Sequence, residues 1–116
     1  MTTNDCLFCK IVAREIPAKL AYEDEHTVAF HDVRPMAPTH VLVIPRRHIV
    51  GVADAKPEDA LTLGQVLLAG RAVAEKTGLV ESGYRLVLNN GVNAGQSVFH
   101  LHLHVLGGRV LAWPPG

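Results

Sequence analysis

The stretch QSVFHLHLHVLGG, residues 96–108, carries a histidine at every second position. Successive side chains of an extended strand point to opposite faces of a sheet, so this alternation predicts a last long strand with two different faces. The apolar face, which we expect to pack against the core, consists of Phe99, Leu101, Leu103 and Val105. The opposite face consists of His100, His102 and His104.

The rest of the sequence predicts further strands and two helices. Four runs with strand-like composition are residues 19–23, 27–30, 41–44 and 85–88. A short helix is predicted over residues 7–15, before Pro17. Between Pro57 and Thr77 the apolar residues change to helical spacing, and Gly78 is a suitable stop. The expected stripe of that long helix consists of Leu61, Leu63, Val66, Leu67, Ala69, Val73 and Ala74.

These elements predict the fold class. An antiparallel sheet of about five strands, with one long helix on a face and a short N-terminal helix, makes an α+β protein. The 116 residues contain no repeat, linker or low-complexity stretch, so we expect a single domain over residues 1–116.

Composition excludes several classes of partner. Eleven basic residues balance eleven acidic ones, so bulk charge predicts attraction neither to nucleic acid nor to a membrane surface. No apolar stretch approaches the roughly 20 residues that a membrane span requires. The N-terminus MTTNDCLFCK lacks the basic and apolar regions of a secretion signal. We therefore expect a cytoplasmic protein.

Three interpretations compete for the histidine face. It is a solvated polar face, a metal site, or a nucleophile flanked by partners that position it and handle protons. Same-face neighbours on a strand lie roughly 7 Å apart, so one metal bound by all three histidines would require a bent strand. The spacing favours a central nucleophile. Its second ring nitrogen must then be held as an N–H donor, and a backbone carbonyl is the expected acceptor.

A glycine- and asparagine-rich loop, residues 90–95, precedes the histidines. Glycine lets backbone N–H groups approach a ligand, so this loop can cradle a phosphate, and Ser97 can donate to an oxygen or a leaving group. The only two cysteines, Cys6 and Cys9, are interpreted as a metal half-site, a redox pair or two small core residues.

The sequence resembles a known family. HLHLHVL resembles the His-X-His-X-His-X-X signature of the histidine triad (HIT) family of nucleotide hydrolases and transferases. The stretches FHDVRP (30–35), APTH (37–40), VIP (43–45), GYR (83–85), GQS (95–97) and WPPG (113–116) resemble its Hint branch, the purine nucleoside phosphoramidases. The resemblance extends from about Cys6 to the last residue.

The resemblance implies a reaction and roles for residues. His102 would attack the α-phosphorus of a purine nucleoside 5′-phosphoramidate, and water would release the monophosphate from the nucleotidyl-histidine. His104 and His40 would orient groups and stabilise charge, and Ser97 would assist the departing amine. Contacts to phosphate or ribose are implied for Asn89, Gly95, Gln96, Ser97 and Asp32. The base pocket would consist of Leu7, Phe8, Ile11, Phe30, His31 and Val33. No divalent ion would be required for catalysis.

The resemblance also implies a metal, a partner and two alternatives. Some relatives complete a structural zinc site with two cysteines and two histidines, here Cys6, Cys9, His48 and His100; two buried thiols are the alternative. Family members of this kind are homodimers whose tail, here with Trp113, reaches the partner's active site. The alternative functions are a dinucleoside polyphosphate hydrolase and a nucleotide-binding or interaction protein with incidental catalysis.

Overall fold

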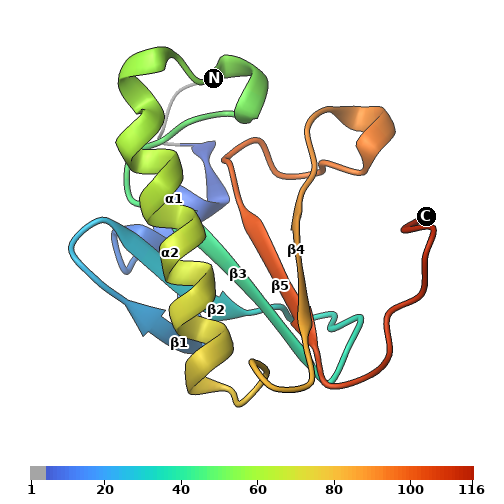
Figure 1. Cartoon of the computed structure of the whole chain (residues 1–116). Coiled ribbons are helices and arrows are strands. Elements are labelled where there is room, and N and C mark those ends of the chain that lie inside the picture. Colours follow the sequence, from blue (N-terminus) through green and yellow to red (C-terminus); the bar gives the residue numbers. More distant parts are fainter. Residues whose placement is uncertain (1–4) are drawn as a thin grey trace.

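Five strands form one antiparallel sheet in the computed structural model, which describes residues 5–116 (Figure 1). The strands are β1 (Leu20–Glu23), β2 (Thr27–His31), β3 (Thr39–Pro45), β4 (Tyr84–Leu88) and β5 (Leu103–Gly107). Their order across the sheet is β1-β2-β3-β5-β4. The predicted α+β fold class is therefore confirmed. Residues 1–4, part of the segment considered for a secretion signal, lie outside the described residues.

Two helices accompany the sheet: α1 (Leu7–Val12) and α2 (Ala60–Lys76). Helix α1 ends earlier than predicted because Arg14 adopts a left-handed conformation, with φ 61°, that a helix cannot continue. Single 3₁₀ turns are η2 (Val52–Asp54), η3 (Pro57–Asp59) and η4 (Val92–Ala94). The predicted start at Pro57 thus corresponds to η3, which leads directly into α2. In the described part of the chain, neither helix has the length and apolar character needed to cross a membrane.

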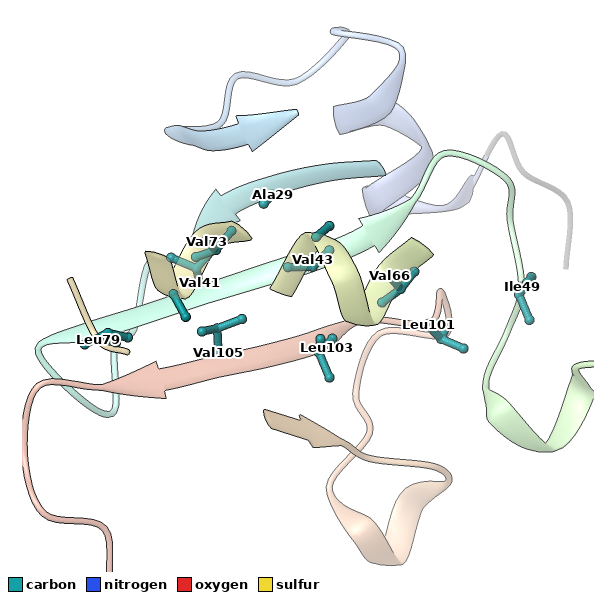
Figure 2. Packing of buried hydrophobic residues seen from close by; sticks show 12 residues of the cluster. Ala29, Val41, Val43, Ile49, Val66, Val73, Leu79, Leu101, Leu103 and Val105 are labelled. Carbon is teal, nitrogen blue, oxygen red and sulfur yellow. The ribbon is translucent and has the colours of Figure 1, made fainter. Parts of the chain in front are cut away.

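Both faces of the sheet are buried, because successive apolar residues of the central strand β3 point to opposite faces. Val41 and Val43 of β3, with Leu103 and Val105 of β5, face α2 (Figure 2). The side chains of β3 in between, Leu42 and Ile44, belong to a second apolar cluster on the other face. That cluster includes Phe8 from α1, so each face of the sheet has its own helix.

The buried stripe of α2 is narrower than predicted. It consists of Val66, Ala69, Gly70, Val73 and Ala74. Leu61 is 73% exposed and Leu67 is also exposed, so the expectation that both pack on the core was wrong. At about 100° per residue, Leu61 lies on the far side of the helix from Val66, and Leu67 lies at the margin of the stripe.

Gly70 allows α2 to approach the sheet closely. A Cβ atom at this position would lie 2.7 Å from Leu103 Cδ2 and 3.5 Å from Leu86 Cδ2. We expect Gly70→Ala to lower the free energy of unfolding by about 1–3 kcal/mol, because overpacking outweighs the better helix propensity of alanine. Urea denaturation measures the change.

Gly64 of the same helix provides the matched control, since nothing lies within 4 Å of a Cβ built there. Gly64→Ala should raise the free energy of unfolding by about 0.5–1 kcal/mol through helix propensity alone. Equal responses of the two variants would contradict the close-approach explanation.

The last strand begins later than the sequence predicts. Strand β5 starts at Leu103, because the chain bends at residues 98–100 and the Leu101 N–H donates to Ile49 O (2.6 Å) in the loop after β3. Phe99 lies in the bend and is 37% exposed, so its predicted place in the core was wrong. Leu101, Leu103 and Val105 are buried as expected.

Candidate functional site

Sheet register brings two histidines together on the face that α2 does not cover. Leu42 of β3 pairs with His104 of β5, and His40 pairs with Leu106, so His40 and His104 are diagonal neighbours on one face. Their ring nitrogens, His40 Nε2 and His104 Nδ1, lie 2.8 Å apart. The resulting contact joins two side chains that are 64 positions apart in the sequence.

A chain of hydrogen bonds fixes the tautomers of these two rings. The backbone N–H of Met36 donates to His40 Nδ1 (3.0 Å), so the proton of a neutral His40 is on Nε2. His40 Nε2–H then donates to His104 Nδ1, which leaves the proton of His104 on its own Nε2. His104 therefore offers an N–H donor at Nε2.

His102 has the opposite tautomer. Its Nδ1 lies 2.8 Å from His100 O, and a carbonyl oxygen only accepts, so Nδ1 carries the proton. The free lone pair is then on Nε2. This arrangement is the one that the sequence argument requires of a nucleophilic histidine, with a backbone carbonyl as the acceptor. The rings of His102 and His104 lie 5.1 Å apart between centroids.

Burial keeps the histidines next to His102 uncharged near neutral pH. Loss of hydration lowers the pKa of His104 to about 4; nearby His102 and His40 add to the shift, and the carboxylate of Asp32 opposes it. Burial also lowers the pKa of His40, again against the charge of Asp32. Neutral rings are required for the tautomers derived above.

These lowered pKa values predict weaker folding in acid. Between pH 6.5 and 4 the unfolded chain binds protons at His104 that the folded chain does not, so the free energy of unfolding falls as the pH falls. Allowing for partial exposure of the ring, we expect a loss of about 1–3 kcal/mol from His104. His40 acts in the same direction. Urea denaturation at pH 7.5 and 5 measures the loss, which His104→Asn should reduce. Equal stability at both pH values would contradict the burial argument.

A cleft of about 510 Å³ opens at the histidines, between α1, β2 and the segment before β5. His102 and His104 line one part of it, and Asp32 lies on its wall. Asp32 Oδ1 accepts the Arg34 backbone N–H (2.8 Å), and Oδ2 lies 3.4 Å from His40 Nε2. Each carboxylate oxygen retains further acceptor capacity for a ligand.

The structure brings most of the residues predicted from the sequence to this cleft. The lining residues among them are Leu7, Phe8, Ile11, Phe30, His31, Asp32, Val33, Gly95, Ser97, His102 and His104. His40 does not line the cleft itself but contacts two residues that do, His104 and Asp32. Six lining residues were not foreseen: Ile16, Pro17, Ala18, Lys19, Leu42 and Val98.

Three predicted contact residues do not line the cleft: Asn89, Gln96 and Trp113. The Gln96 side chain is buried and fully engaged, since Nε2 donates to Val50 O (2.7 Å) and Oε1 accepts the Gly91 N–H (2.8 Å). It braces the loop that presents Ser97. Trp113 belongs to the C-terminal tail, which runs beyond β4 in Figure 1, and is 80% exposed. Its ring centroid lies 6.0 Å from Cζ of Arg85 on β4.

Beside the cleft, four potential metal ligands gather from three parts of the chain: Cys6, Cys9, His48 and His100. His100 Nδ1 lies 3.3 Å from Cys6 Sγ, 3.5 Å from Cys9 Sγ and 3.2 Å from His48 Nδ1. His100 Nε2–H donates to Pro45 O (2.9 Å), so the Nδ1 that faces the thiols is unprotonated. Both cysteines are free thiols, and burial raises the pKa of Cys9 to about 11.

These spacings fit a tetrahedral ion. With bonds of about 2.3 Å to sulfur and 2.0–2.1 Å to nitrogen, two nitrogens should lie about 3.3–3.4 Å apart, a nitrogen and a sulfur about 3.5–3.6 Å, and two sulfurs about 3.8 Å. The Cys9 Sγ–His48 Nδ1 distance is 3.3 Å, so this distance and those of His100 lie within a few tenths of an ångström of the tetrahedral values. The Cys9 backbone N–H donates to Cys6 Sγ (3.3 Å), which holds that sulfur beside the other three side chains.

A second group, Asp32, His40 and His104, has ligand atoms as close together. Its chemistry is different, because the Met36 N–H occupies His40 Nδ1 and so requires a proton on Nε2, the nitrogen that faces His104. A protonated nitrogen cannot bind a metal. This group is a hydrogen-bonded relay rather than a metal site.

Comparison with known proteins places the whole chain among relatives. The HIT domain family matches residues 13–111. An uncharacterized HIT-like protein of Synechococcus elongatus is 52% identical over 114 residues, which cover 98% of this chain and 99% of the relative.

Solved structures agree with that match. A HIT family hydrolase from Legionella pneumophila superposes with a TM-score of 0.94 at 49% identity, over 97% of this chain and all of the other. A zinc-bound histidine triad family protein from Mycobacterium smegmatis superposes with a TM-score of 0.80 at 38% identity, over 93% of this chain and 78% of the other.

Proposed function

The chain belongs to the HIT domain family, and on that premise we propose that it hydrolyses the P–N bond of purine nucleoside 5′-phosphoramidates. The HIT family hydrolase of Legionella pneumophila, 49% identical, supports a hydrolase in general. The observation that carries the narrower proposal is His102, with Nδ1–H held by His100 O at 2.8 Å and a lone pair left on Nε2. The ring lines a cleft that also contains an N–H donor and a carboxylate.

In the first step, His102 Nε2 attacks the α-phosphorus and forms a P–N bond while the bond to the substrate amine breaks. The attacking ring becomes positively charged, and His100 O stabilises that charge through the Nδ1–H. The departing amine takes a proton from solvent water through the hydroxyl of Ser97, which lines the same cleft. No part of this step requires a divalent ion.

In the second step, water attacks the same phosphorus, the bond to His102 breaks, and the nucleoside monophosphate leaves. His104 Nε2–H is the donor for a phosphoryl oxygen in both steps, and His40 keeps that proton in place. Asp32 is proposed to accept the ribose hydroxyls, and the apolar wall around Phe30 to hold the base.

We also propose that Cys6, Cys9, His48 and His100 hold a structural zinc ion. Support comes from the ligand spacings, from the unprotonated Nδ1 of His100, and from the zinc-bound relative of Mycobacterium smegmatis. The ion would supply crosslinking of α1, the loop after β3 and the segment before β5. The protein would supply all four ligands, as in structural rather than catalytic zinc sites.

A cytoplasmic homodimer is the proposed form of the protein. β4 is an edge strand with half-exposed Leu86 and Leu88, a surface that a second copy could cover. The balanced charge supports a small-molecule substrate rather than nucleic acid or membrane. Trp113 on the exposed tail would then approach a neighbouring subunit. Analytical ultracentrifugation of the wild type and of Leu86→Lys tests this form, and a wild-type monomer would contradict it.

The experiment that tests the function compares adenosine 5′-phosphoramidate with diadenosine tetraphosphate as substrates of the purified protein. Faster release of AMP from the phosphoramidate is the expected result. Preference for the tetraphosphate would replace the proposal by a dinucleoside polyphosphate hydrolase. Binding of AMP without turnover of either compound would indicate a nucleotide-binding protein.

A further inference from the structure

In the sequence, Phe8 lies between Cys6 and Cys9 of the metal-ligand cluster, and its ring contacts that of His102. Its side chain is only 4% exposed, and its ring centroid lies 5.1 Å from that of His102, with an interplanar angle of 89°. Further edge contacts join it to His100 (6.0 Å) and to Phe30 (5.3 Å). Edge-to-face contacts of this kind are directional and depend on the orientation of both rings.

Without such a contact, the imidazole ring of His102 would not be held in a single orientation. A single hydrogen bond, from Nδ1–H to His100 O, fixes one point of the ring. Rotation about that bond would still sweep Nε2 across the cleft. The edge contact with Phe8 restricts this rotation, and His104 stands on another side at 5.1 Å. Attack on phosphorus depends on such alignment, where a misplacement of about 1 Å costs on the order of 10²-fold in rate.

Two of the contacts of the His102 ring, with Phe8 and with His100 O, connect it to the metal-ligand cluster. Phe8 is fixed by its neighbours in the chain, since Cys6 is buried and its Sγ accepts the Cys9 N–H (3.3 Å). The carbonyl that holds Nδ1–H belongs to His100, whose ring lies 3.3 Å from Cys6 Sγ. The backbone at His100 and the ring of Phe8 therefore both connect the four candidate ligands to the imidazole of His102.

We infer that Phe8 is a positioning residue, which transmits the order of the Cys6–Cys9–His48–His100 cluster to the nucleophilic ring of His102. The inference rests on the proposed function, because it assigns Phe8 a role in the reaction of His102. It extends that function: a metal ion in the cluster would set the orientation of the nucleophile as well as the stability of the fold.

The first test replaces Phe8 by leucine, which keeps an apolar side chain in the cleft but removes the aromatic edge. We expect kcat for adenosine 5′-phosphoramidate to fall about 10–100-fold. Because Phe8 also lines the cleft, the affinity for AMP is measured separately, and the loss in kcat should exceed any loss in affinity. The ¹⁵N chemical shifts of the His102 ring, which report its tautomer, should move from the Nδ1–H form toward a mixture.

Phe30→Leu is the matched control, because Phe30 packs against Phe8 but its ring contacts include none with His102. A similar loss of aromatic packing should leave the His102 tautomer unchanged. If both variants alter the tautomer equally, or if Phe8→Leu alters neither tautomer nor kcat, the positioning role is wrong.

The second test removes bound metal from the wild type with a chelator and restores it with Zn²⁺. The His102 shifts should move as in Phe8→Leu and return with the ion, and chelation should have a smaller effect on Phe8→Leu itself. Unchanged shifts after metal removal would overturn the connection to the cluster. Because this readout is independent of turnover, a wild type that fails to cleave the phosphoramidate would refute the proposed function separately.

Discussion

Replacement of His102 by alanine is expected to lower kcat/KM for adenosine 5′-phosphoramidate by about 10⁴-fold or more. In the proposed reaction the ring supplies the atom that bonds to phosphorus, and none of the neighbouring histidines can take its place. His104 presents an N–H rather than a lone pair, and His40 is committed to His104. The affinity for AMP, measured by calorimetry, should remain within about tenfold, because the proposed contacts to the base and the ribose are unaffected.

Two control variants define the result. His104→Ala should cost about 10²–10³-fold, the usual loss when one donor to a developing oxyanion is removed. His26→Ala should leave the rate unchanged, because His26 is an exposed histidine in the turn between β1 and β2. Turnover by His102→Ala close to that of the wild type would contradict the role of His102 as the nucleophile. The covalent step is tested by denaturing the wild type during turnover; the absence of a nucleotidyl adduct on His102 would contradict that step.

Replacement of Cys9 by serine is expected to remove bound zinc and to lower the melting temperature by about 10 °C or more. The cluster joins α1 to the loop after β3 and to the segment before β5, so losing one ligand would release three parts of the chain together. A loss of about 3 kcal/mol corresponds to that shift for a domain of this size. Elemental analysis and calorimetry measure the two quantities.

Chelation provides the internal control for this prediction. A chelator should lower the melting temperature of the wild type to nearly that of Cys9→Ser and should leave Cys9→Ser unchanged. A wild-type protein purified without zinc, whose melting temperature responds neither to chelator nor to added Zn²⁺, would show that the four side chains are a polar core and not a metal site.

Local patterns were enough to predict the sheet and the long helix. β-branched runs and helical spacing are properties of neighbouring residues, so β3 and α2 lie where the sequence places them, with ends that differ by a few positions. The start of β5 was missed because the bend at residues 98–100 depends on a distant partner, the carbonyl of Ile49. No nearby residue in the sequence signals that bond.

The same distinction applies to the site. Alternation and family resemblance predicted that His102, His104 and Asp32 belong to the site, and all three line the cleft. Nothing in the sequence indicated that Ile16 and Lys19 also line it. Gln96 was expected to contact a ligand, but its amide is satisfied by three backbone groups, Val50 O, Val98 O and Gly91 N–H. A polar side chain in a loop can serve either purpose, and only the fold decides which.

Met36 stands at the start of the hydrogen-bond chain, yet only its backbone takes part. Its N–H sets the proton on His40, while its side chain is 70% exposed. Position 36 can therefore accumulate almost any substitution over evolution without disturbing the tautomers downstream. Proline is the exception, because it has no N–H to donate. A position that varies freely among homologues but excludes this one residue would be the evolutionary trace of the relay.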